Sequence, residues 1–181
     1  MDKEFLVGIE LNSKTITAGL VDLSGKIVKK VVFPSELSKG KKKVVENIAL
    51  AVNKVKKDKI LGVGISLPGV VNREKGIVVE SPYPGWNNLA LKKLVEDTIH
   101  CPVYIENEGK CFTIAEYKCG VFRKTNNTIG VLFNEDISSG FIIDGKLAQG
   151  SSFAAGNLGQ SLIDNKKGKL SDYASPIAIE K

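Results

Sequence analysis

The chain has 181 residues, of which 43% are hydrophobic and 25% charged, and its formal net charge is +6. This is the balance of a soluble globular protein with one ordinary domain or two small lobes. No apolar run approaches the roughly 18 residues that a membrane-spanning helix needs, and the charged start is not a signal peptide, so we expect a cytoplasmic protein without membrane contact.

The positive charge is concentrated in residues 39–59, which also carry a helical apolar pattern. A solvated lysine face on an amphipathic helix accounts for this concentration. No aromatic residues are interleaved with these lysines to stack on bases, so direct nucleic-acid binding is not expected. The three cysteines include no C-x-x-C pair, which indicates neither a disulfide framework nor a zinc cluster.

Three strands are predicted first, separated by short turn signals such as Ser24-Gly25. Their expected ranges are residues 5–11, 15–23 and 26–33. A helix is predicted over residues 40–57, where valine and isoleucine recur at helical spacing with lysines opposite.

The next part of the chain alternates short apolar runs with amphipathic segments. It predicts, in order, a strand at 60–67, a short strand at 76–79, a helix at 88–99, a strand at 103–105 and a helix at 109–119.

Beyond Gly120 the strand pattern begins again, with Asp144-Gly145 as a hairpin turn. The expected strands are residues 128–133, 140–143 and 146–148. The order β-β-β-α-β-α-β followed by β-β-β predicts an α/β protein built from two copies of one plan. We expect a complete first lobe at residues 1–120 and a partial, β-rich second lobe at 121–181 that lacks helices.

Short sequence segments that match a known family pattern, in the same order along the chain, cover nearly all of its length. They are the segments 7–11, 18–25, 62–71, 81–82, 85–88, 102–107, 115–117, 140–150, 154–156, 173–175 and 179–181, with Gly120 and Leu170. Together they resemble the ROK family of actin-like sugar kinases and sugar-responsive repressors. The resemblance implies an actin-like ATPase (RNase H-like) fold with a complete first lobe and a truncated second lobe, without the family's zinc loop.

In the family, a Glu-Asn pair precedes the aspartate that accepts the proton of the sugar hydroxyl. The resemblance places Glu108 at this base position and Asn107 at a sugar contact. Glutamate is one methylene longer, and a misplacement of about 1 Å can cost about a hundredfold in rate. Lys110 could also pair with Glu108 and lower its basicity. The alternative is that Glu108 is a helix N-terminal carboxylate that complements the helix dipole.

The two phosphate loops of the family are altered here. In the first, residues 10–15, both family glycines are absent, and Asn12 and Thr15 are the candidate cofactor contacts. In the second, Glu135 and Asp136 precede the polar and glycine residues Ser138, Ser139 and Gly140. Carboxylates beside a triphosphate would repel it. ATP and magnesium are therefore expected only if the chain is a kinase, and otherwise no cofactor is expected.

The sugar-contacting turn of the family has a glutamate and a nearby histidine. The corresponding residues are Asn157 and Gln160, which are neutral but still donate and accept hydrogen bonds. The same histidine binds zinc in the family together with three cysteines, in whose place stand residues 165–169. Tetrahedral zinc needs Cys or His ligands, so no metal site is expected. His100 is interpreted as a surface or helix C-terminal residue.

A sheet face around Val131, Leu132, Ile142 and Ile143 is expected to lack the cover that further helices give in the family. An exposed apolar face of this kind usually marks an interface. The sequence therefore predicts a homo-oligomer, or a partner chain that covers the second lobe.

Three functions remain open. The first is a non-catalytic ROK-like domain with a sugar-sensing or regulatory role. The second is an ATP-dependent sugar kinase of the glucokinase type with atypical loops. The third is a structural or interaction protein without a small-molecule ligand, since a fold does not determine a function.

Overall fold

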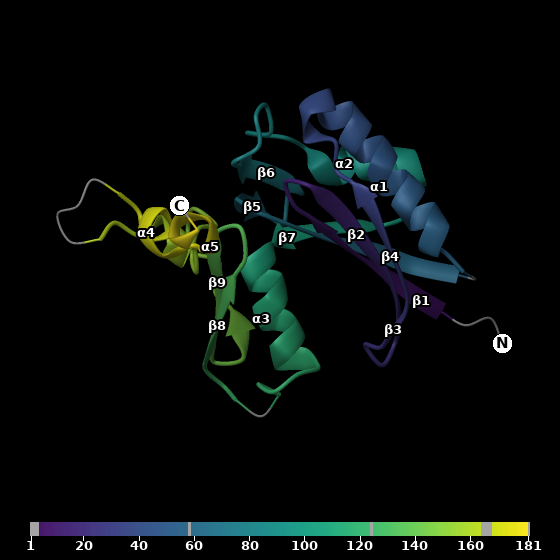
Figure 1. Ribbon diagram of the computed structural model, residues 1–181. Helices are drawn as coiled ribbons and strands as arrows, with labels where there is room; N and C mark the ends of the chain where they lie inside the picture. The colour runs from purple at the N-terminus through teal and green to yellow at the C-terminus, as the bar shows by residue number, and fades with distance from the viewer. Residues whose placement is uncertain (1–3, 58, 124, 164–167, 181) are drawn as a thin grey trace. The chain divides into compact units, whose positions relative to one another are not determined.

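The computed structural model describes residues 4–57, 59–123, 125–163 and 168–180 (Figure 1). The chain divides into two compact units, Met1–Asn107 and Glu108–Lys181. Among the described residues, the first unit contains a five-stranded sheet and a two-stranded hairpin, and the second unit contains a three-stranded sheet. The mixed α/β class expected from the sequence is confirmed.

The sheet of the first unit has the strand order β3-β2-β1-β4-β7. Strands β1 (Glu4–Leu11), β2 (Thr15–Asp22) and β3 (Ile27–Pro34) form an antiparallel meander. Strands β4 (Lys59–Leu67) and β7 (Val103–Asn107) continue the sheet in parallel with β1. All five strands were predicted, and their bounds differ from the expected ones by one or two residues.

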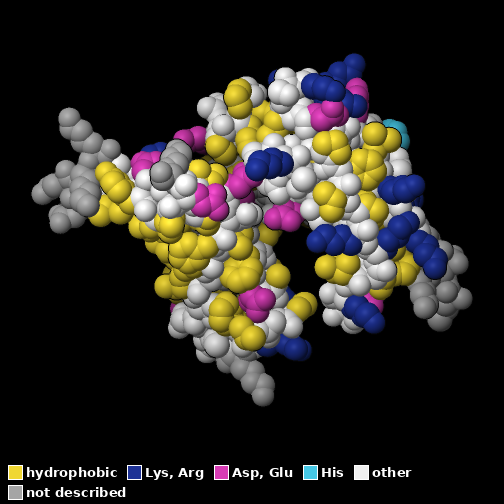
Figure 2. Space-filling model, viewed as in Figure 1, with side chains coloured by type: hydrophobic (Ala, Val, Ile, Leu, Met, Phe, Trp, Pro, Cys, Tyr) yellow, Lys and Arg dark blue, Asp and Glu magenta, His cyan; other side chains and the backbone are white. Residues whose placement is uncertain are grey.

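Helix α1 (Lys41–Val55) covers one face of this sheet and packs on β2 and β3. Its buried side is mainly valine, isoleucine and alanine, while Lys41, Lys42 and Lys54 are exposed. Figure 2 shows the Lys and Arg side chains spread over the surface of this unit, which fits a solvated lysine face. The amphipathic helix predicted from the sequence is therefore confirmed.

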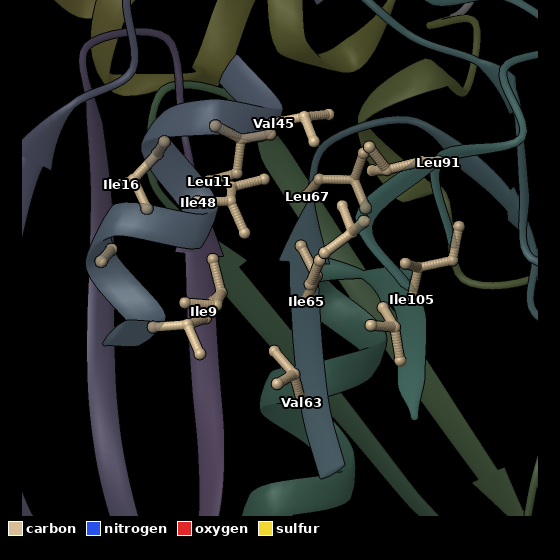
Figure 3. Close-up of a cluster of buried hydrophobic side chains, with 14 of the residues drawn as sticks. Ile9, Leu11, Ile16, Val45, Ile48, Val63, Ile65, Leu67, Leu91 and Ile105 are labelled. Carbon is tan, nitrogen blue, oxygen red and sulfur yellow. The ribbon is translucent and has the colours of Figure 1, made fainter. Parts of the chain in front are cut away.

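Aliphatic side chains from β1, β2, β4 and β7 meet α1 and α2 (Leu91–Ile99) in one core (Figure 3). Its labelled members include Ile9, Leu11, Ile16, Val45, Ile48, Val63, Ile65, Leu67, Leu91 and Ile105. Strand residues on this face alternate with more exposed ones, as in β1, where every second residue is buried. His100 caps the C-terminus of α2; it is exposed and left-handed (φ 52°), in agreement with the sequence interpretation of a surface or helix C-terminal residue.

A small hairpin lies between β4 and α2, formed by β5 (Val70–Asn72) and β6 (Ile77–Glu80). Only its second strand was predicted, because β5 has three residues and is too short for a periodic pattern. Helix α2 begins at Leu91 rather than near Asn88, since Asn88 is left-handed and Leu89 pairs with Val78.

The second unit begins with helix α3 (Glu108–Lys118), which packs on β8 (Thr128–Phe133) and β9 (Ile137–Ile143). Strand β10 (Lys146–Leu147) completes a sheet of order β10-β9-β8. The division of the chain therefore falls before α3 and not at residue 120, because α3 finds its packing partners in the strands that follow it.

Short helical turns follow the three strands: η2 (Leu158–Gln160), α4 (Leu170–Ala174) and α5 (Pro176–Ile179). The expectation that residues 121–181 lack helices is thus wrong. These helical segments have three to five residues, so they give no helical periodicity in the sequence. Contacts with β9 and η2 hold α4 in place.

Glycines allow α3 to approach the sheet closely. Gly130 and Gly140 are cross-strand partners on β8 and β9, and Thr113 of α3 lies over both. Its buried hydroxyl donates to the carbonyl oxygen of Gly109 at 2.8 Å and lies 3.3–3.4 Å from those of Gly140 and Gly130. A Cβ on Gly140 would lie 2.6 Å from the Thr113 hydroxyl oxygen and 2.9 Å from the Lys110 Cα.

The opposite face of this sheet is partly open. Ile129 and Phe133 are each 62% exposed and Ile143 is 54% exposed. Ile142 is buried, and Val131 and Leu132 are half-buried, so the four-residue face expected from the sequence is wrong in part. Successive strand residues point to opposite faces, so Ile142 and Ile143 cannot share one. Figure 2 shows hydrophobic side chains gathered over this unit.

Replacing Gly140 with alanine should destabilise the second unit. The added methyl group would overlap Thr113 and the α3 backbone, and overpacking of this kind costs about 1–3 kcal/mol. Gly8→Ala is the matched control, since no atom lies within 4 Å of the Cβ it would add on β1. Urea unfolding of both variants measures the difference, and equal midpoints would contradict the close contact.

Glu36 stabilises the segment that precedes α1, and its backbone adopts a left-handed conformation (φ 53°). The Asn47 amide, itself almost completely buried, donates to the Glu36 carboxylate at 3.0 Å and to the Pro34 carbonyl at 3.1 Å. Lys39 pairs with the same carboxylate, and Lys43 lies 3.7 Å from it. The hydrogen bond from Asn47, followed by that from Lys39, lowers the Glu36 pKa to about 2.

Glu36→Gln should therefore lower stability in a pH-dependent way. A depressed carboxylate pKa contributes stability above its unfolded value of 4.5, and the contribution is lost as pH falls towards about 2. The free energy of unfolding of wild type and variant should differ most near neutral pH, and the gap should narrow between pH 4.5 and 2. A gap that stays constant over this range would contradict the role of Glu36.

Candidate functional site

The turn between β1 and β2 is organised by Asn12. Its side-chain oxygen accepts hydrogen bonds from the backbone N–H groups of Lys14 (3.0 Å) and Thr15 (2.7 Å) and from the Thr15 hydroxyl (3.2 Å). The buried Ser35 hydroxyl donates to the Ser13 carbonyl at 2.9 Å. Backbone N–H groups that face one point can bind an anion, and here two of them face the Asn12 carboxamide.

Asn107 ends β7 in the first unit and is almost completely buried. Its side-chain nitrogen donates to the Gly69 carbonyl at 3.0 Å, and its backbone N–H donates to the Glu106 carboxylate at 2.8 Å. Gly69 has φ 118°, and a Cβ there would meet the Glu80 backbone. The end of β7 and the turn after β4 are thus held together through the Asn107 amide.

Glu108 is the first residue of α3 and is half-buried. Its carboxylate lies in the first turn, where a negative charge complements the helix dipole. The next residue, Gly109, donates its backbone N–H to the Ser138 hydroxyl at 3.1 Å. A Cβ on Gly109 would lie 2.6 Å from the Ser138 carbonyl carbon, which explains why glycine stands here.

The side chain of Lys110 runs into the interior of the second unit, and the residue is only 2% exposed. Its ammonium donates to the Gln149 side-chain oxygen at 3.1 Å and to the Phe153 carbonyl at 2.7 Å. Buried ammonium groups need such acceptors, since desolvation of an unpaired charge is costly. The pairing of Lys110 with Glu108 stays a prediction.

Ser139 connects β9 to the turn that precedes Asn157. Its hydroxyl donates to the Gly156 carbonyl. Gly156 has φ 86°, and a Cβ there would meet the Ser139 carbonyl oxygen at 2.7 Å. Gly109 and Gly156, the chain neighbours of Glu108 and Asn157, thus contact the Ser138–Gly140 segment of β9 within the second unit.

Gln160 lies at the end of η2 and is exposed. Its side-chain nitrogen donates to the Asp136 carboxylate at 3.4 Å, and its oxygen accepts a hydrogen bond from the Lys169 ammonium. Asp136 also accepts the Ile137 backbone N–H at 2.7 Å. Gln160 therefore links the start of β9 to the start of α4.

Within the described ranges, no three His, Cys, Asp or Glu side chains are grouped closely enough to hold a metal ion. Of the segment expected in place of the zinc loop, residues 165–167 lie outside the described residues. No helix in the part of the chain that the structure describes is both long and apolar enough to cross a membrane.

The candidate residues divide between the two units: Asn12, Thr15 and Asn107 belong to the first, and the others to the second. Sequence reasoning missed the contacts of Lys110 with Gln149 and Phe153. The available signal was a lysine in a mostly apolar helix, but its partners are about 40 residues away and no local pattern names them.

The fold of the first unit and the repeated strand plan of the second define the actin-like α/β class. The fold closely matches that of a ROK family glucokinase from Streptomyces griseus in complex with glucose and AMPPNP, with a TM-score of 0.89 and 24% sequence identity. This match covers 97% of the present chain and 58% of that one.

A family model described as ROK family matches residues 6–177, and the chain belongs to this family. It is 30% identical to a glucokinase of Thermotoga maritima, over 100% of this chain and 60% of that protein. It is also 29% identical to a xylose repressor of Caldicellulosiruptor bescii, over 88% of this chain and 41% of the repressor. The chain thus spans 60% or less of these two relatives, one a kinase and the other a repressor.

Proposed function

We propose that this chain is a non-catalytic ROK domain that binds a sugar and acts as a sensor or regulator. The observation that carries the proposal is the position of the Asn12 side chain. In the family's kinases the corresponding loop uses glycines to bring backbone N–H groups to the phosphates. Here the N–H groups of Lys14 and Thr15 donate to the Asn12 oxygen. A phosphate would have to displace a neutral acceptor that the chain itself supplies.

The second loop supports the same proposal. It carries the carboxylates of Glu135 and Asp136, both half-buried, where the kinases have glycine and threonine. Two negative groups beside a triphosphate raise its free energy of binding, and burial weakens the solvent screening that would offset this. ATP and magnesium are therefore not part of the proposed function.

Sugar binding is supported by the amides that remain. Asn107 and Asn157 stand at the positions of two sugar contacts in the family, and each amide both donates and accepts hydrogen bonds. Asn157 is half-buried, in the turn held by Ser139. Gln160 is less suited to this role, because both ends of its side chain are engaged by Asp136 and Lys169.

A sugar kinase is the second candidate. It is favoured by the 30% identity to the Thermotoga maritima glucokinase and by Glu108, a carboxylate at the family's base position. Glutamate can serve as a general base if its oxygens reach the sugar hydroxyl. Under this alternative Mg-ATP binds and the sugar is a hexose.

Thermal shift with hexoses and N-acetylhexosamines, each with and without Mg-ATP, tests the proposal. A sugar at about 100 times its dissociation constant should stabilise the protein by about 2.7 kcal/mol, which is a shift of several degrees. Asn157→Ala should abolish the shift, and Asn53→Ala, at an exposed position on α1, should leave it unchanged. A shift with Mg-ATP would instead support the kinase, and no shift at all would favour an interaction protein without a small ligand.

The open apolar face of β8 and β9 is proposed to contact a second copy of the chain. It presents Ile129, Phe133 and Ile143, each more than half exposed. Sedimentation velocity should show a species larger than the 19.5 kDa monomer. Phe133→Lys should shift it towards monomer, because a charge within an apolar contact is costly to desolvate. A wild type that is monomeric at every concentration would contradict this contact.

A further inference from the structure

The turn that carries Asn157 has an unusual backbone. Gly150, Phe153 and Gly156 all have positive φ angles, of 70°, 63° and 86°. Backbone hydrogen bonds from Phe153 to Gly150 (3.2 Å), from Ala155 to Gln149 (3.1 Å) and from Asn157 to Ala154 (3.1 Å) close the turn on itself. These local bonds define its shape, but they do not attach it to the rest of the unit.

Phe153 is the strained residue of this turn. Glycine adopts a positive φ at little cost, whereas a bulky residue such as phenylalanine does so only when its surroundings hold it there. The carbonyl of Phe153 accepts a hydrogen bond of 2.7 Å from the Lys110 ammonium. A charge-assisted bond of this length is among the stronger ones in a protein.

The Lys110 ammonium can keep the turn in position because the Lys110 backbone is itself held in place by close packing. The Lys110 Cα lies against Gly140 in the glycine-lined contact between α3 and β9. The side chain is almost completely buried, and its ammonium bonds both Gln149, at the start of the turn, and Phe153, in its middle. Helix α3 therefore attaches the turn at two points through one side chain.

We propose that Lys110 is a positioning residue for the ligand site: it holds the 149–157 turn in the conformation that presents Asn157. The identity of the ligand as a sugar rests on the proposed function above. The stabilisation of the turn by Lys110 does not depend on that function. Lysine suits this role because its three donors on one nitrogen can reach acceptors in different directions. Lys110 acts through the turn and does not itself contact the sugar.

Hydrogen exchange of the protein without ligand tests the hold on the turn. Lys110→Met keeps the length and apolar stem of the side chain and removes the ammonium. Exchange of the Phe153, Ala155 and Asn157 amides should rise about tenfold or more, as expected for the loss of one charge-assisted hydrogen bond. The amides of β8 should be unchanged. Lys118→Met, at an exposed position of the same helix, is the matched control.

A second variant keeps the proposal testable if Lys110→Met does not fold. Gln149→Met removes the Gln149 acceptor of the Lys110 ammonium at a half-buried position. It should raise exchange in the same turn, and Lys110→Met should add less in the Gln149→Met background than in wild type. Such non-additivity is expected for residues that are in contact or belong to one hydrogen-bond network.

Sugar affinity provides the functional measurement. If wild type binds a sugar, Lys110→Met should weaken binding about tenfold or more, while Lys118→Met should not. If wild type binds no sugar, the proposed function fails. Faster hydrogen exchange in the turn of Lys110→Met would still support the stabilisation of the turn by Lys110. Unchanged exchange in residues 149–157 of both Lys110→Met and Gln149→Met would overturn the proposal, as would sugar affinity equal to that of wild type.

Discussion

The second unit depends on the close contact between helix α3 and the paired strands β8 and β9. Gly109 on the helix and the cross-strand pair Gly130 and Gly140 remove the side chains that would hold the backbones apart. Thr113 fills the space and directs its hydroxyl towards the carbonyls of all three glycines. Since packed interiors tolerate little overlap, each of these residues is constrained by the others.

The consequences of this contact reach the residues proposed to bind a ligand. It places Glu108 at the first turn of α3 and brings Ser138 against the backbone of Gly109. It also fixes the position of the Lys110 Cα. From there the side chain extends so that its ammonium donates hydrogen bonds to Gln149 and Phe153. Gly109 and Lys110 therefore both have structural roles: Gly109 permits the close approach of α3 to β9, and Lys110 attaches the turn.

The first unit shows a different relation between family pattern and local chemistry. Its five-stranded sheet and aliphatic core retain the family plan, while the β1–β2 turn has lost its glycines. Asn12 supplies the acceptor that satisfies the N–H groups of that turn. The N–H groups of this turn are thus satisfied by a side chain of the turn itself, which fulfils their hydrogen-bonding requirement.

The sequence by itself determined the strands of the five-stranded sheet, helices α1 and α3, the hairpin plan of the second unit and membership of the ROK family. These features rest on periodicity, turn residues and ordered landmarks, which are local in the chain. It also identified Asn12, Glu108, Ser138 and Asn157 as residues of interest, by their order in the family pattern. Only the tertiary structure decided that α3 belongs with the strands after it, that Ile142 is buried and that Lys110 bonds to Phe153. These features depend on contacts between residues that are far apart in the chain and come together only after the backbone has folded. No local sequence pattern predicts which of these residues will be in contact.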